Sequence, residues 1–421
     1  MADAKEIERK GELADPWSIP LEELDPSDAR LFQSGQHLDY FERLRKEDPV
    51  HWYESEAFGG FWSVTKFADI MAVDRNHKAF SSEPTIVIGD LGEEVPITQF
   101  IAKDPPIHDE QRKAVNPAVA PTQLADLESL IKERVAKVLD SLPVDEEFDW
   151  VDRVSIEITT QMLATLFDFP WEDRRLLPYW SDVATSFDGV GSTARTAEER
   201  QQILMECLEY FQKLWVERAA QPRKFDFISL MAHDPKTKDM VNNPMDFLGN
   251  ILLLIVGGND TTRNSMTGGV YFLNKYPEEF AKLKADPSLI PNMVSEIIHY
   301  QTPLGHMRRT ASQDIELGGK QIKKGDKVVM WYVSGNRDEE AIENPDQFII
   351  DRDRARQHLS FGFGIHRCMG NRVAEMQLRI LWEEILKRFD DVKVVGEPKR
   401  VQSNFVLGYE TMPVKLVKKG A

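Results

Sequence analysis

Apolar residues recur at helical spacing over most of the chain. The longest such pattern covers residues 244–275, and it begins with an asparagine at the N-cap, Asn243, followed by a proline, which predicts a helix start. Residues 124–233 are also mostly helical by period. A further pattern follows residue 370, where apolar positions three and four apart predict an amphipathic helix: Ala374, Leu378, Leu381, Ile385 and Phe389.

The pattern nearer the N-terminus predicts a mixed region. Residues 37–48 predict a helix, residues 50–53 and 60–64 predict paired strands, and residues 65–73 predict a return to helix. Residues 80–100 contain glycine and proline and predict an irregular segment. The sequence therefore favours a mainly α protein with small β-sheets, of the α+β class.

Composition and charge exclude several classes of protein. The net charge of −18 argues against nucleic-acid binding, and two cysteines in 421 residues are too few for a disulfide framework. No apolar run approaches the roughly 20 residues of a membrane span, and the charged N-terminus lacks the apolar region of a signal peptide. We therefore expect a cytoplasmic protein. Length alone suggests two or three domains, although no linker divides the chain.

Residues 361–370, FGFGIHRCMG, form the most informative segment. They place Cys368 among glycines, immediately before the helix predicted after residue 370. The dipole and free N–H groups of a helix N-terminus favour a thiolate, which is the form of cysteine that binds metals. A lone cysteine is otherwise more often a buried structural residue, as we expect for Cys207.

The middle of the longest predicted helix reads GGNDTT over residues 257–262. Two glycines inside a helix cost roughly 1 kcal/mol each relative to alanine, so their presence needs a reason such as close approach of a ligand. A threonine hydroxyl also bonds back to a carbonyl one turn earlier and bends the helix. The alternative is a packing contact between helices beside a polar stripe.

The spacing Phe-x-x-Gly-x-His-x-Cys-x-Gly in residues 361–370 resembles the haem-binding loop of the cytochromes P450. The resemblance covers nearly the whole chain and implies the P450 fold, of the soluble bacterial kind. It also implies one catalytic domain over residues 21–421 after a polar arm of residues 1–20. The cofactor would be haem b, with Cys368 as the axial thiolate to iron and with Phe361, His366 and Gly370 in the same loop.

The same resemblance implies roles for residues outside this loop. Asp260 and Thr261 match the acid–alcohol pair of the family, in which the threonine hydrogen-bonds the oxygen and the acid relays protons from solvent. The haem propionates would be held by four residues, with Arg308 as the alternative if the register slips by one: His108, Arg112, Arg309 and His366. By family position, residues 179–195 would include a mobile lid.

One position departs from the family pattern. P450s carry Glu-x-x-Arg where this chain has Glu296 and His299, and Arg352 resembles the third member of that group. Histidine offers at most two donors and titrates near neutrality, whereas arginine is a permanent cation with a planar fork. We therefore expect haem retention to depend more strongly on pH than it would with arginine.

The expected substrate is small and apolar. Residues 301–311 and 408–413 resemble the bacterial terminal hydroxylases of medium-chain alkanes and fatty acids, and by family position eight residues line the pocket: Ile86, Val87, Gly257, Leu304, Met307, Phe405, Val406 and Leu407. The other interpretations are a P450 acting on terpenoid or steroid rings, a peroxygenase using H2O2, and a haem-thiolate sensor.

The expected partners are O2, a ferredoxin and an NAD(P)H-dependent ferredoxin reductase, because no dinucleotide fingerprint, flavin domain or ferredoxin domain is visible. An acidic donor would need a local basic face on this acidic chain. The candidates for that face, on a protein we expect to be monomeric, are Arg112, Lys113, Arg367, Arg372 and Arg379.

Overall fold

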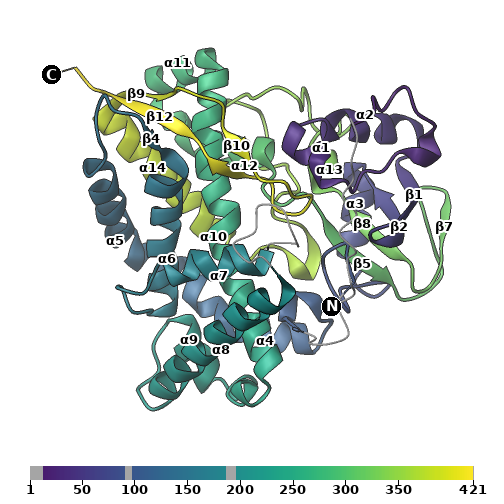
Figure 1. Ribbon diagram of the computed structural model, residues 1–421, viewed down its shortest axis with the longest axis horizontal. Coiled ribbons are helices and arrows are strands. Elements are labelled where there is room, and N and C mark those ends of the chain that lie inside the picture. The colour runs from purple at the N-terminus through teal and green to yellow at the C-terminus, as the bar shows by residue number, and fades with distance from the viewer. Residues whose placement is uncertain (1–12, 91–96, 186–195, 421) are drawn as a thin grey trace.

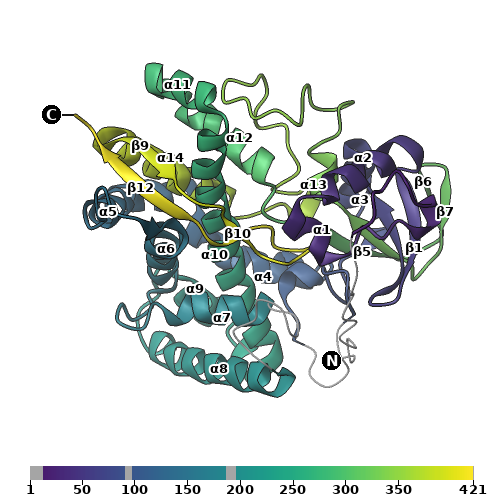
Figure 2. The ribbon, with the colours of Figure 1, turned by 45° about the horizontal axis from the view of Figure 1, so that its top comes forward.

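The computed structural model of the protein describes residues 13–90, 97–185 and 196–420. Figure 1 shows a large helical region with a smaller region around a β-sheet at one side of it. The longest helix, α10, runs through the middle of the helical region in both views (Figures 1 and 2). The predicted mainly helical α+β class is confirmed.

The α-helices make up nearly half of the described chain. Their bounds are α1 Ala29–Ser34, α2 His37–Glu47, α3 Phe67–Arg75, α4 Ile107–Val115, α5 Pro121–Asp140, α6 Glu157–Phe167, α7 Leu176–Thr185, α8 Ala197–Ala219, α9 Phe227–His233, α10 Pro244–Lys275, α11 Pro277–Ala285, α12 Ile290–Gln301, α13 Tyr332–Gly335 and α14 Asn371–Arg388. No helix in the described ranges combines the length and the apolar composition that a membrane span requires.

The main sheet has the strand order β1-β2-β8-β5-β3, with β2 parallel to β8 and the other neighbours antiparallel. Its strands are β1 Val50–Ser55, β2 Gly59–Val64, β3 Phe80–Ser81, β5 Met307–Ala311 and β8 Lys327–Met330. The smaller sheets pair β6 Ile315–Leu317 with β7 Lys320–Ile322, β10 Lys399–Arg400 with β11 Tyr409–Thr411, and β12 Pro413–Lys418 with both β4 Phe148–Asp149 and β9 Phe389–Val394.

Three details differ from the predictions. The helix expected at 65–73 begins at Phe67, because Thr65 is held by Pro49, whose carbonyl accepts from both its N–H and its hydroxyl. Asn243 stands at the N-cap of α10, but its side chain makes no capping hydrogen bond. Within the expected lid, residues up to Thr185 belong to α7, and residues 186–195 lie outside the described residues.

The hydrophobic core surrounds α10. Large side chains from α6, α10 and α14 are fully buried in one cluster, among them Phe167, Phe247 and Trp382. A second cluster lies between the main sheet and α3, and a third lies between that sheet and α2. Residues 13–20 contact α2, since the Tyr40 hydroxyl donates to Ala14 O at 2.9 Å. Residues 1–12 of the predicted arm lie outside the described residues.

Candidate functional site

Cys368 lies in the turn before α14. Its N–H donates to the carbonyl of Phe361 at 2.8 Å, which closes the loop on itself. The N–H groups of Gly370 and Asn371, at the start of α14, point at the sulfur as predicted. The sulfur is surrounded by protein atoms and yet remains accessible, as a group facing an opening does.

The pKa of the Cys368 thiol shifts in the direction opposite to the one predicted from its place at a helix N-terminus. Burial raises the pKa of the thiol, and the two N–H groups together with Arg112 and Arg367 offset that only in part. The helix N-terminus alone therefore does not produce a thiolate here. A bound metal cation would, because coordination deprotonates a thiol.

The cysteine loop is fixed to the end of α3 through Asp74. Gly364 has φ +68°, and a Cβ there would come within 2.4 Å of the Asp74 carbonyl oxygen, so only glycine fits. The buried Asp74 carboxylate accepts from Phe363 N at 2.7 Å, from the Tyr332 hydroxyl at 2.9 Å and from Arg309 Nη2 at 2.9 Å. No pattern in the sequence pointed to this aspartate.

The four predicted propionate partners lie together. The rings of His108 and His366 are 4.2 Å apart between centroids. Burial, followed by the positive charges of Arg309, His108 and Arg112, lowers the pKa of His366 to about 2. Arg112 comes from α4 and donates to the carbonyl of Arg367, beside the cysteine.

The structure distinguishes Arg309 from Arg308. Arg308 turns away from this group, donating to the Asp90 carboxylate at 2.8 Å and to the carbonyl of Gly89 at 3.2 Å. Arg309 stays buried beside Asp74 and contributes to the positive field on His366. These contacts favour Arg309 over the one-residue alternative.

These residues fit a haem. The buried atoms His108 Nε2 and His366 Nδ1 have no hydrogen-bond partner among the described residues. The positive charges of Arg309 and Arg112, which add to burial in lowering the pKa of His366, would stabilise a carboxylate placed beside it. The group therefore suits the two propionates of a haem whose iron is bound by Cys368.

The two glycines in the middle of α10, Gly257 and Gly258, have different surroundings. A Cβ on Gly257 would meet no atom within 4 Å, so this side of the helix adjoins open space, whereas a Cβ on Gly258 would lie 2.6 Å from Leu163 of α6. The Thr261 hydroxyl donates back to the Gly257 carbonyl at 3.2 Å, as predicted. One turn before Thr261, at residue 257, the helix therefore presents a surface without a side chain.

Asp260 faces a different direction from Thr261, because successive helical residues are about 100° apart. It is fully buried, its Oδ1 accepts from Asn259 Nδ2 at 3.0 Å, and the same oxygen forms an ion pair with Arg263 Nη2 at 3.1 Å. Arg263 also pairs with Asp182 of α7 at 2.7 Å. Burial raises the pKa of Asp260 to about 6, with Arg263 lowering it and Asp182 raising it. A carboxyl of this kind exchanges protons close to neutral pH.

Most of the predicted pocket residues come from three segments that touch one another. Leu304 forms an isolated β-bridge with Val406, and Gly305 N donates to the Phe405 carbonyl at 2.7 Å. Arg308 N, next to Met307, donates to the Ile86 carbonyl at 2.7 Å. The segments 86–88 and 405–407 are therefore both joined to residues 304–308, whereas Gly257 belongs to α10.

Comparison with known proteins decides the family. The Cytochrome P450 family model matches residues 145–416. The chain belongs to the cytochrome P450 family. Linalool 8-monooxygenase of Pseudomonas putida is 34% identical over 95% of this chain and 100% of its own length. Methyl-branched lipid omega-hydroxylase of Mycobacterium tuberculosis is 31% identical over 89% of this chain and 90% of its own length.

A solved P450 structure is similar to this chain in both sequence and fold. CYP153D17 from Sphingomonas sp. PAMC 26605 is 46% identical, with a TM-score of 0.88, over 94% of this chain and 100% of its own. The predicted family and fold are confirmed. Membership in the P450 family implies a haem-thiolate iron centre, and Cys368 is the cysteine of the matching loop.

The P450 scaffold behind the cysteine loop is built around Glu296. This buried carboxylate accepts from Arg352 Nε at 2.9 Å, from Ile349 N at 2.9 Å and from His299 Nδ1 at 3.1 Å. Although burial alone would raise it, the pKa of Glu296 is lowered by His299 and Arg352. The other ring nitrogen of His299 lies 2.8 Å from the carbonyl of Asn336, so only the imidazolium donates to both acceptors.

Replacing His299 by arginine is expected to shift the acid-induced loss of the Soret band to lower pH. A carboxylate with a depressed pKa stabilises the fold above its unfolded pKa, and that stability is lost as the pH falls through the folded value. A second permanent cation would lower the pKa of Glu296 further. The His299→Gln variant, which has no positive charge, should lose the band at higher pH than the wild type. An acid midpoint that is the same in all three proteins would contradict this role.

Further contacts join α10 and α12 to the segment that carries Phe405, Val406 and Leu407. Asn264 Oδ1 accepts from Tyr409 N at 3.1 Å, and a Cβ on Gly408 would come within 2.0 Å of it. Gln301 Nε2 donates to the Leu407 carbonyl at 2.9 Å. Sequence reasoning missed these amide side chains, which look like ordinary helical polar residues until their partners are known.

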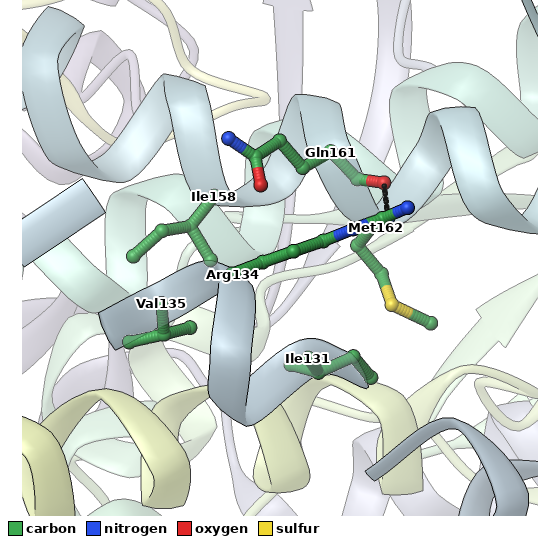
Figure 3. A pocket seen from close by; sticks show the side chains of 6 residues that line it. All are labelled: Ile131, Arg134, Val135, Ile158, Gln161 and Met162. Atoms are coloured by element: carbon green, nitrogen blue, oxygen red, sulfur yellow. Dashed lines mark hydrogen bonds between the residues drawn. The ribbon is translucent and has the colours of Figure 1, made fainter. Parts of the chain in front are cut away.

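A small cavity elsewhere in the molecule is not part of this site. It lies between α5 and α6, away from the cysteine loop and α10, and its volume of about 10 Å³ suits at most one water molecule. Arg134 crosses it and donates to the Gln161 carbonyl at 3.0 Å (Figure 3). The residues that line it are Ile131, Arg134, Val135, Ile158, Gln161 and Met162.

Proposed function

We propose that the protein is a haem b monooxygenase that hydroxylates the terminal carbon of medium-chain alkanes, fatty acids or similar lipids. The observation that carries the reaction class is the convergence of His108, Arg112, Arg309 and His366 beside the Cys368 loop. The similarity to an omega-hydroxylase of methyl-branched lipids supports attack at a chain end.

In the proposed reaction, a C–H bond of the substrate becomes C–OH. One oxygen atom of O2 enters the alcohol, and the other leaves as water with two electrons and two protons. Haem, when bound, supplies the redox iron that activates dioxygen. The protein would bind that iron through Cys368, neutralise the propionates with Arg112 and Arg309, and hydrogen-bond them through His108 and His366.

Delivery of the two protons that the reaction consumes is assigned to Asp260 and Thr261. Asp260 is the proton store, since burial places its pKa near 6. Arg263 pairs with the carboxylate of Asp260 and with Asp182 of α7. If the ion pair between Arg263 and Asp260 opened, the Asp260 carboxyl would be free to exchange protons with solvent. Thr261 would turn its hydroxyl from the Gly257 carbonyl to the oxygen substrate, which the open surface at Gly257 permits.

Electrons are proposed to come from a ferredoxin, reduced by an NAD(P)H-dependent ferredoxin reductase. Arg112, Lys113, Arg367 and Arg372 have no carboxylate within ion-pair distance in the described chain, whereas Arg379 pairs with Glu128 and Glu383. The contact between Arg112 and the Arg367 carbonyl brings α4 next to the cysteine loop. The first four cations therefore suit an acidic donor better than Arg379 does.

Selectivity for a terminal carbon must come from shape, because a primary C–H bond is stronger than its secondary neighbours. The predicted pocket residues in segments 86–88, 304–307 and 405–407 are all apolar, as a channel for a hydrocarbon requires. The similarity to a linalool monooxygenase favours terpenoids as the second candidate substrate class. We also propose that the protein is a cytoplasmic monomer and that it binds no nucleic acid.

The test is a titration of the purified protein with alkanes, fatty acids and terpenoids. A shift of the Soret band from low to high spin identifies the compounds that bind, and mass spectrometry of products made with a ferredoxin system identifies the oxidised carbon. Terminal alcohols from linear chains support the proposal. Turnover of terpenoids alone would assign the protein to the second class.

Replacing Thr261 by alanine is expected to divert electrons from product to peroxide, since the hydroxyl directs protons to oxygen. Product formed per NADH should fall about tenfold or more, while Thr261→Ser, which keeps the hydroxyl, should stay near the wild type. If both product and peroxide are unchanged in Thr261→Ala, oxygen activation at this pair is wrong, and the sensor and peroxygenase alternatives gain support.

A further inference from the structure

His306 precedes β5 and is completely buried. Its Nδ1 lies 3.0 Å from the carbonyl of Asn404, and its Nε2 lies 3.2 Å from the N–H of Ile88. Burial lowers the pKa of His306 to about 4, so the ring is neutral at pH 7. A neutral imidazole has one donor and one acceptor, and here Nδ1–H donates to Asn404 while Nε2 accepts from Ile88.

The two backbone segments that meet at this ring carry five of the predicted pocket residues. Ile86 and Val87 precede Ile88, and Phe405, Val406 and Leu407 follow Asn404. The ring also packs against Phe405, with centroids 5.2 Å apart, and against Trp331 at 4.9 Å. The side chain is thus a polar link between segments that are otherwise apolar and far apart in sequence.

The neighbouring Gly305 shows how closely these parts approach. A Cβ at this position would come within 2.6 Å of the Asn404 carbonyl oxygen, the same oxygen that accepts from His306. Backbone hydrogen bonds attach each segment to the strand separately, through Gly305 N to Phe405 O and through Arg308 N to Ile86 O. The His306 ring reaches both segments with one rigid group, so it fixes the distance between them.

We propose that His306 is a positioning residue that sets the shape of the substrate pocket by holding residues 86–88 at a fixed distance from residues 404–407. This inference rests on the proposed function, because it assumes that the two segments contact the substrate. A fixed arrangement of the side chains on these segments limits how far a flexible chain turns in the pocket, and so it controls which carbon is oxidised.

Two variants separate the hydrogen bonds from the packing. His306→Phe keeps an aromatic ring against Trp331 and Phe405 but removes both hydrogen bonds. His306→Gln loses the ring and keeps one donor and one acceptor. His233→Phe is the control, because both ring nitrogens of His233 also contact backbone groups, the carbonyls of Ser229 and Gln221, but the residue lies on α9. The CO-difference spectrum near 450 nm selects preparations of each holoenzyme that retain the thiolate-bound haem.

The first measurement is amide hydrogen exchange of the holoenzymes without substrate. In His306→Phe, peptides covering residues 84–90 and 401–408 should exchange about tenfold faster or more, because the Ile88 N–H loses its acceptor. The second measurement is the product distribution with linear substrates, where the share of subterminal alcohols should rise several-fold. His306→Gln should stay closer to the wild type in both, and His233→Phe should equal it in both.

Two outcomes would overturn the proposal. One is unchanged exchange and unchanged product distribution in His306→Phe. The other is His306→Gln behaving like His306→Phe, which would assign the effect to ring packing. Failure of the proposed function is distinguishable, because the wild type would then give no terminal alcohol although the exchange result still stands.

Discussion

Replacing Asp260 by asparagine is expected to lower the rate of product formation by about 100-fold, the size of a lost general acid–base group. Asparagine keeps the shape of the side chain but cannot hold or release a proton. In the wild type the acid is protonated below its pKa of about 6, so the rate should fall as the pH rises above that value. This limb of the pH–rate profile should be absent in Asp260→Asn.

Asp182→Asn serves as the matched variant for this prediction. It leaves the relay carboxylate in place and removes the nearby negative charge that raises the pKa of Asp260. The limb should therefore persist and move to lower pH. The profiles are measured as initial rates of alcohol formation at saturating substrate. A limb near pH 6 that survives in Asp260→Asn would show that another group titrates there.

Replacing Asp74 by alanine is expected to cause the largest loss of stability, about 3–5 kcal/mol in the free energy of unfolding. The change leaves the buried Arg309 guanidinium without its anion and removes the acceptor of the Tyr332 hydroxyl and of Phe363 N. Urea unfolding of the holoenzyme measures the effect. The fraction of protein that retains haem should fall with it, because the cysteine loop loses its attachment to α3.

The control for Asp74 is Asp69→Ala on the same helix. Asp69 is only half-buried, and burial raises its pKa, so its removal should change the free energy of unfolding little. The double variant Asp74→Ala with Arg309→Leu should be less destabilised than the sum of the single variants, since no unpaired charge remains. Additive effects would mean that the ion pair contributes no coupling energy.

The parts of the site that can be predicted from the sequence are those with a local pattern. The Cys368 loop has glycines and a following helix, and the middle of α10 has two glycines and a threonine, so the residue order alone places both on their elements. The residue order leaves two candidates for the propionate-binding arginine, Arg308 and Arg309. What separates Arg309 from Arg308 is the location of Asp74 and Asp90, which lie more than two hundred residues earlier.

The parts that the sequence does not predict depend on single polar residues inside apolar surroundings. Asp74 and His306 become informative only when the chain brings their partners to them, because neither has a spacing or composition that distinguishes it from a surface residue. The charge state of Cys368 is a related case. Its place at a helix N-terminus follows from the sequence, but the atoms packed around the sulfur decide the direction of its pKa shift.

The contacts of Asp74 also fix the order in which the chain can assemble during synthesis. The carboxylate is separated from Arg309, Tyr332 and Phe363 by 235, 258 and 289 residues. At about 5–20 residues per second, the last of these partners leaves the ribosome roughly 15–60 s after Asp74 does. The Asp74 carboxylate on α3 therefore lacks these partners through most of translation, and the cysteine loop is among the last parts of the molecule to fold.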